Sequence, residues 1–151
     1  MRYLITLLFV VSVTAAEPTK EQTKEAADSL RGAWRCEELQ VLRGEGLNFE
    51  DLEVVFRAER CEFLVRRPKD SDEATIAATC DVQLDTTTTP NRMDLALKLE
   101  LEDKSEKRLA IYKVERGTLT ICWGQTRPTQ FKCGDGAGEG SFLAVFKRVK
   151  R

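Results

Sequence analysis

From residue 33 onward the chain alternates apolar and polar side chains, which is the pattern of a β-strand with one buried face. The clearest run is residues 92–102, in which every second side chain is methionine or leucine and most of those between are charged. An antiparallel sheet with one face in water has this alternation. Such runs predict eight strands, at residues 33–41, 51–57, 61–67, 74–84, 92–102, 107–115, 118–123 and 141–149.

Short reversals between these runs predict which residues lie opposite each other. Tight turns at residues 58–59 and 116–117, and a longer reversal that contains Pro90, bring the apolar side chains of each hairpin to one face. The predicted pairs are Phe56–Cys61, Val54–Phe63, Leu52–Val65, Leu84–Met93, Val82–Leu95, Cys80–Leu97, Val114–Leu119, Tyr112–Ile121 and Ala110–Trp123. Eight consecutive strands with one apolar face predict an all-β fold, an eight-stranded antiparallel up-and-down barrel. A two-sheet sandwich is the alternative.

The inner face of this barrel is predicted to be almost entirely apolar. Its members are Trp34, Cys36, Leu52, Val54, Phe56, Cys61, Phe63, Val65, Ile76, Ala78, Cys80, Val82, Leu84, Met93, Leu95, Leu97, Leu99, Ala110, Tyr112, Val114, Leu119, Ile121, Trp123, Phe142, Ala144 and Phe146. The interior of an eight-stranded barrel either fills with side chains or holds one small ligand, and this set fits both.

Large side chains of this face are the candidate ligand contacts. They are Trp34, Phe56, Phe63, Leu97, Tyr112 and Trp123. Tyr112 brings a buried hydroxyl that needs a partner, either a backbone group or a ligand that it orients.

The first 16 residues have the features of a signal peptide, with Arg2 before a short apolar run and the small residues Ala15 and Ala16 at the cleavage site. The apolar run is about half as long as a membrane-spanning helix. We therefore predict an exported chain, periplasmic or extracellular, that is soluble after cleavage and has no stable membrane anchor. Residues 17–31 are rich in Lys, Glu, Gln and Ala, which predicts a helix before a barrel domain of residues 32–151. The helix is expected to pack on the barrel as a plug or lid, and the alternative is a helix that binds a partner.

Export would place the five cysteines in an oxidising environment. Cys61 and Cys80 fall opposite each other on adjacent strands, so the alternatives are a disulfide and two buried thiols. Cys122 points outward and flanks the loop that contains Cys133, and a second bridge between these two is equally open. Cys36 would then be the unpaired thiol. No CxxC spacing supports a zinc knuckle or a thioredoxin-type centre.

Composition excludes several kinds of chemistry. The 151 residues contain no histidine, which excludes Ser-His-Asp and Cys-His nucleophiles and His-ligated zinc or haem. The formal net charge of -1 provides no field that would attract nucleic acid. No carboxylate is predicted on the inner face, where burial would shift its pKa. We therefore predict a protein that is not an enzyme, with no cofactor, no metal and no nucleic-acid partner.

Motifs along the chain resemble those of known barrels. Gly32-Ala33-Trp34 is similar to the GxW signature of lipocalin-like barrels, and the resemblance implies that Arg148 in the last strand stacks on Trp34. A closer resemblance covers residues 29–149 and is to small exported lipocalin-like domains of unknown function, abundant in planctomycete bacteria. Its segments are Leu30-Arg31-Gly32-Ala33-Trp34, Leu84-Asp85 with Thr87 and Pro90, Met93-Asp94-Leu95, Ile111-Tyr112-Lys113-Val114, Gly117-Thr118-Leu119-Thr120-Ile121-Cys122, Arg127-Pro128-Thr129-Gln130-Phe131 and Val145-Phe146-Lys147-Arg148. Gln130 replaces a residue that is often acidic in that family. The resemblance implies fold and export but no activity.

Two functions follow from these predictions. The first is a carrier of a small apolar molecule inside the barrel. The second is a non-enzymatic envelope module with a filled barrel, which contacts another protein through its outer face or its long loop. That loop, residues 124–140, is expected either to act as a lid or partner contact or to cross the barrel end.

Overall fold

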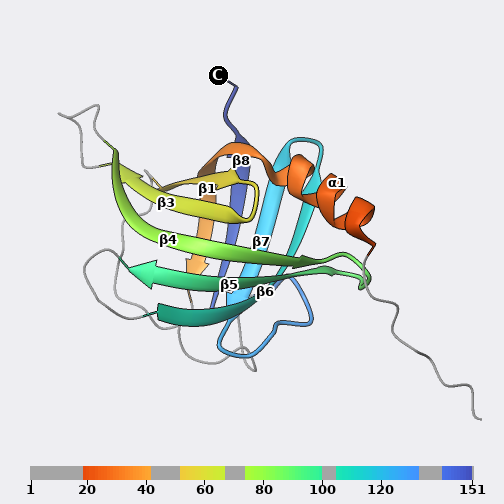
Figure 1. Ribbon diagram of the computed structural model, residues 1–151. Helices are drawn as coiled ribbons and strands as arrows, with labels where there is room; N and C mark the ends of the chain where they lie inside the picture. Colours follow the sequence, from red (N-terminus) through yellow and green to blue (C-terminus); the bar gives the residue numbers. More distant parts are fainter. Residues whose placement is uncertain (1–18, 42–51, 67–73, 100–104, 133–140, 151) are drawn as a thin grey trace, which may run out of the picture.

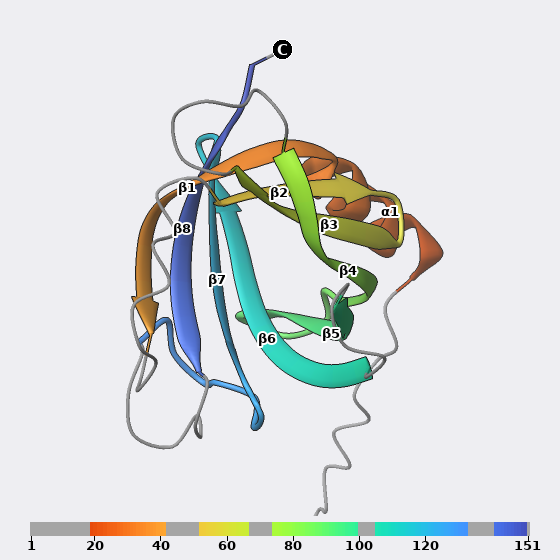
Figure 2. The ribbon, with the colours of Figure 1, turned by 90° about the vertical axis from the view of Figure 1, so that its left-hand side faces the viewer.

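A computed structural model describes residues 19–41, 52–66, 74–99, 105–132 and 141–150. Eight antiparallel strands form a closed barrel in the order of the sequence, and one helix precedes them (Figure 1). Figure 2 shows the sheet curving round until the last strand lies beside the first. The elements are α1 (Lys20–Leu30), β1 (Gly32–Val41), β2 (Leu52–Arg57), β3 (Arg60–Arg66), β4 (Ala74–Asp85), β5 (Asn91–Leu99), β6 (Ser105–Glu115), β7 (Thr118–Gly124) and β8 (Phe142–Arg148). The predicted up-and-down barrel is confirmed, and the sandwich is excluded.

The predicted register is also confirmed. All nine residue pairs that the turn positions predict are observed, in the hairpins β2–β3, β4–β5 and β6–β7. On β8, Phe142, Ala144 and Phe146 pair with the inward residues of β7, as expected. Alternation and turn position are local properties of the chain, which is why they determine these pairs.

A β-bulge in β4 turns one residue that was predicted to point inward to the outer face. Phe63 pairs with Ala78, but Leu64 pairs with Ile76, so Ala77 is the extra residue on β4. An extra residue moves every side chain before it to the other face of the strand. Ile76 therefore points outward and is 39% exposed, and its predicted place in the interior is wrong.

A second bulge, in β1, turns apolar side chains toward the inner face instead of away from it. The register with β8 shifts between Cys36 and Glu38, which makes Glu37 the extra residue. Beyond it, Leu39 pairs with the inward Ala144, and Val41 pairs with the inward Phe142. The end of β1 therefore contributes apolar side chains to the inner face.

The helix α1 begins later than predicted, at Lys20 rather than near residue 17. Thr19 is its N-cap, and the side chain of Gln22 returns a bond to the Thr19 backbone, forming a capping box. Leu30, in its last turn, is buried in the barrel core. Figure 1 shows α1 at the end of the barrel where β1 begins, and it packs against β4 as a plug would.

Residues 125–132, after β7, lie on the outer wall of the barrel rather than across its end. Arg127 donates to the backbone oxygen of Ala110 at 2.8 Å and forms an ion pair with Asp94 on β5. Lys113 lies 5.5 Å from the ring centre of Phe131, which adds a cation–π contact. The expectation of a lid or an end-crossing loop is therefore wrong for this segment.

The predicted signal peptide lies outside the described residues. Among the residues that are described, no helix is both long enough and apolar enough to cross a membrane.

Candidate functional site

The two ends of the barrel differ, and the end that α1 covers is here called the closed end. Trp34 donates from Nε1 to the backbone oxygen of Leu30 at 2.7 Å. The guanidinium of Arg148 lies 4.2 Å from the centre of the Trp34 ring. It also donates to the backbone oxygens of Arg31, at 2.8 Å, and of Ser29. These contacts satisfy carbonyls that the helix end leaves open, and they confirm the expected stacking of Arg148 on Trp34.

Gly32 is the joint between α1 and β1. Its φ of +117° lies in a region that side chains rarely adopt. A Cβ at this position would also stand 3.4 Å from Nη1 of Arg148. The structural role predicted for Gly32 therefore follows from both its backbone and its contact with the arginine.

The half of the barrel beside the closed end is solid. Its inner side chains come from all eight strands, and most of them are buried, with Leu84 and Val114 partly buried. Those with almost no exposed surface include Trp34, Val54, Phe56, Met93, Tyr112, Leu119, Ile121 and Phe146. Close packing of this kind is what a folded core requires. Leu30 is the buried side chain by which α1 joins this core.

The opposite end is here called the loop end, and its inner face is apolar but less completely buried. Val41 is 42% exposed. Several apolar side chains of this inner face are only partly buried and pack against the edge of the buried core: Leu39, Val65, Leu97, Leu99 and Phe142. The segments that connect the strands at this end fall largely outside the described residues.

An aromatic contact crosses the barrel interior from one wall to the other, at a level between the two ends. The rings of Phe63 on β3 and Trp123 on β7 meet edge to face, with centres 5.6 Å apart. Trp123 also packs against Phe142 on β8. Because β3 and β7 lie on opposite walls of the barrel, this contact forms a floor beneath the inner face of the loop end.

The six predicted ligand contacts divide into two groups along the barrel axis. The pairing register places Phe63, Leu97 and Trp123 toward the loop end. It places the other three, Trp34, Phe56 and Tyr112, toward the closed end. In the loop-end group Phe63 and Trp123 are buried and Leu97 is partly buried, whereas all three residues of the closed-end group are buried.

Tyr112 does not have the backbone partner that was one alternative. Its hydroxyl is buried and makes no hydrogen bond of normal geometry. Burial raises the pKa of Tyr112 to about 12, and the neighbouring Asn91 side chain lowers this pKa by less than burial raises it. Because Tyr112 pairs with Asn91 at the start of β5, its ring lies in the closed half and away from the partly exposed loop end.

Cys61 and Cys80 lie opposite each other as predicted, and of the two alternatives the structure has two buried thiols rather than a disulfide. The two cysteines lie 4.0 Å apart and are not bonded. The backbone N–H of Val82 donates to the oxygen of Glu59 at 2.7 Å. By the alternation of an antiparallel ladder, Cys61 and Cys80 then occupy a hydrogen-bonded pair, whose Cα atoms are about 5.5 Å apart and whose side chains diverge more than in the other type. The hydrogen bond between the thiols, together with burial, raises the pKa of Cys61 far above its ordinary value.

The other cysteines have separate environments. Cys36 is a buried thiol whose Sγ contacts the backbone oxygen of Glu38 at 3.4 Å, and burial raises its pKa. Cys122 points outward, as predicted, and its Sγ lies 3.8 Å from the backbone oxygen of Lys132. Cys133 lies outside the described residues, so the predicted bridge between it and Cys122 stays a prediction.

A charged pair on the inner wall was missed by the sequence interpretation. Arg108 pairs with the inward Leu95 across β5–β6, and Glu106 pairs with the inward Leu97. The two charged side chains form an ion pair with each other. The signal was available, because both residues have the same parity along the strand as Tyr112. The expectation of an inner face without a carboxylate is therefore wrong at the loop end.

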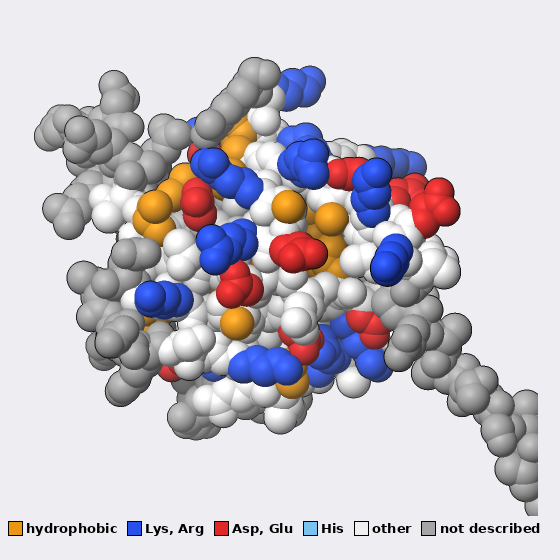
Figure 3. Space-filling view, viewed as in Figure 1, with side chains coloured by type: hydrophobic (Ala, Val, Ile, Leu, Met, Phe, Trp, Pro, Cys, Tyr) orange, Lys and Arg blue, Asp and Glu red, His pale blue; other side chains and the backbone are white. Residues whose placement is uncertain are grey.

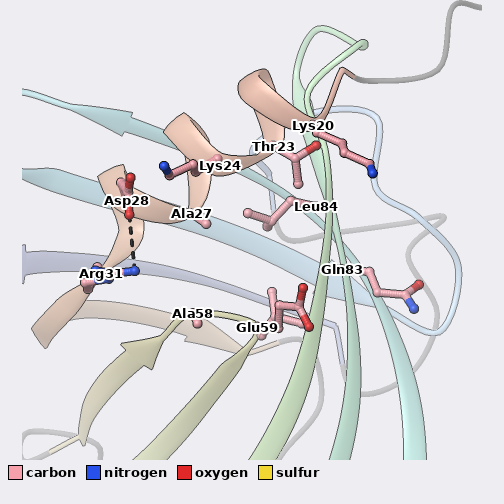
Figure 4. A pocket seen from close by; sticks show the side chains of 11 residues that line it. Lys20, Thr23, Lys24, Ala27, Asp28, Arg31, Ala58, Glu59, Gln83 and Leu84 are labelled. Carbon is pink, nitrogen blue, oxygen red and sulfur yellow. Dashed lines mark ion pairs between the residues drawn. The ribbon is translucent and has the colours of Figure 1, made fainter.

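A surface groove of about 680 Å³ lies between α1 and the barrel wall (Figure 4). Lys20 and Lys24 border it on the helix side, Glu59 borders it on the hairpin side, and Leu84 lies between them. Figure 3 shows acidic and basic side chains mixed over the face of the molecule seen there. Within the described ranges, no three Cys, Asp or Glu side chains come together as a metal site would require. The groove offers opposite charges at its two borders and singles out no ligand.

No protein-family model matches the chain, and no curated protein or solved structure is significantly similar to it.

Proposed function

We propose that this protein binds one small apolar molecule on the inner face of the loop end of its barrel. The observation that carries the proposal is the contrast in burial along the barrel axis. Most of the inner apolar side chains that are only partly buried lie at the loop end, whereas in the closed half Leu84 and Val114 are partly buried and the others are buried. Apolar surface on a concave wall gains about 25 cal/mol for each Å² that a ligand removes from water.

The aromatic floor determines how deep such a ligand reaches. Phe63 and Trp123 meet across the barrel, so a ligand lies on the loop side of their rings and does not extend to α1. The same contact is also what favours the second function, a filled barrel that acts as an interaction module. The two functions therefore differ in whether the loop end takes up an apolar molecule.

Titration with N-phenyl-1-naphthylamine, a neutral dye that fluoresces when it leaves water, distinguishes the carrier from the filled barrel. We expect saturable binding to the wild-type protein. Leu97→Gln places a polar group on the inner wall and should weaken binding by about fivefold or more. Ile76→Gln is the matched control, because this residue lies at the same end of the barrel but points outward.

Two results would contradict the proposal. Absence of saturable binding to the wild-type protein would favour the filled barrel. Equal binding by Leu97→Gln and the wild-type protein would place the dye elsewhere, with the groove beside α1 as the next site to test. Circular dichroism of each variant checks that the barrel is folded.

A further inference from the structure

The inner face of the loop end is apolar except for one ion pair and a threonine. Every strand contributes to this face, and its charged members among the described residues are Arg108 and Glu106 on β6. The remaining inner side chains there are aliphatic or aromatic, apart from Thr75 on β4. A charge on such a wall loses hydration, so it needs a function or a partner.

Arg108 is the more deeply placed of the two charges. Its side chain is 20% exposed, and that of Glu106 is 46% exposed. Leu95 lies directly opposite Arg108, and Trp123 lies opposite Ala110, which is two residues further along β6. The backbone of Arg108 therefore lies between the level of the aromatic floor and the mouth of the barrel, and its guanidinium pairs with Glu106.

Donor capacity remains on this guanidinium after the ion pair is formed. Glu106 accepts from Nη2 alone, whereas an arginine has five N–H donors arranged in a planar fork. A carboxylate fits that fork with two parallel hydrogen bonds. Arginine also keeps its charge at every pH at which the protein is folded, so the site does not depend on a titration.

We infer that the ligand ends in a carboxylate, which Arg108 binds while the apolar body of the ligand lies against the inner wall. This inference rests on the proposed function, because it names the chemical class of the molecule that occupies the same site. Glu106 competes with the ligand for Arg108 and so lowers the affinity for a carboxylate. A polar group of the ligand would thus lie beside β6, with its chain over Leu97 and Trp123.

The test compares decanoate with 1-decanol, which has the same chain length and no charge, as competitors of the neutral dye. The measured quantity is the ratio of the two dissociation constants. Arg108→Gln should reduce the preference for decanoate by about tenfold or more, because hydrogen bonds to charged groups are strong in apolar surroundings. Glu106→Gln should raise the affinity for decanoate by about threefold and leave that for decanol unchanged. Lys98→Gln is the matched control, since Lys98 is exposed and alternates with the inward residues of β5.

The outcomes are distinguishable from failure of the proposed function. If both competitors displace the dye and Arg108→Gln leaves their ratio unchanged, the inference is wrong and the apolar site stands. An equal loss of both competitors in Arg108→Gln also contradicts the inference, because the arginine then only supports the wall. If the dye does not bind the wild-type protein at all, the proposed function itself fails.

Discussion

The closed end and the loop end are built from the same strands, yet they differ in how completely their inner apolar side chains are buried. At the closed end, Trp34, Leu30 and Arg148 join α1, β1 and β8 by hydrogen bonds and ring stacking. At the loop end, several apolar side chains remain partly exposed. The inner wall there also carries the ion pair between Arg108 and Glu106. A barrel can thus obtain its stability from one half and keep the other half for binding, because packing energy depends on how completely each side chain is buried.

The two tryptophans give the largest test of this contrast. Trp34→Ala should lower the free energy of unfolding by about 5 kcal/mol, because it removes a fully buried ring and its contacts with Leu30 and Arg148. Trp123→Ala should cost less, about 3 kcal/mol, since its surroundings are less completely buried. Urea denaturation followed by circular dichroism measures both. Equal losses would mean that the loop end is as solid as the closed end.

A smaller but better matched test uses two leucines of β5. Leu95 and Leu97 point to the same face two residues apart, and Leu95 is 1% exposed whereas Leu97 is only partly buried. Leu95→Ala should cost about 3 kcal/mol and Leu97→Ala about 1 kcal/mol. The same urea titrations measure the difference. A larger loss for Leu97→Ala would reverse the assignment of the two halves.

The smallest effect at neutral pH concerns the hydroxyl of Tyr112. Tyr112→Phe removes a buried polar atom that has no hydrogen bond, so stability should rise by about 1 kcal/mol. The pKa of Tyr112 is raised to about 12, whereas an unfolded tyrosine ionises near pH 10. Between these values the unfolded state loses its proton first, so wild-type stability falls as the pH rises, by up to about 2.7 kcal/mol at the upper limit.

Tyr112→Phe should lack this contribution to the alkaline fall, which the ultraviolet absorbance of tyrosinate can follow directly in the wild-type protein. A wild-type pKa near 10 would contradict the burial that assigns this ring to the solid half. A loss of stability in Tyr112→Phe would mean that the hydroxyl has a partner in solution.

Much of the fold could be predicted, and the exceptions have physical causes. Strand bounds agreed to within a few residues, because alternation and turn positions are local. The two bulges, at Glu37 and Ala77, were not predicted, because an extra residue is recognised only against the strand beside it. The candidate site was half predicted, because Phe63, Leu97 and Trp123 do lie toward the loop end. Arg108 was missed, although its parity with Tyr112 along β6 placed it on the same face.

The sequence by itself determined the number of strands, their order, their register in three hairpins and the apolar character of the inner face. These follow from a period of two and from short reversals, both of which act between residues close in the chain. Only the tertiary structure decided which end is sealed, which inner residues keep exposed surface, and why Cys61 and Cys80 are not bonded. The first two properties depend on closure of the barrel, which places β8 beside β1 and α1 across one end. The third depends on the hydrogen-bonding pattern between β3 and β4, and the sequence pattern contains neither.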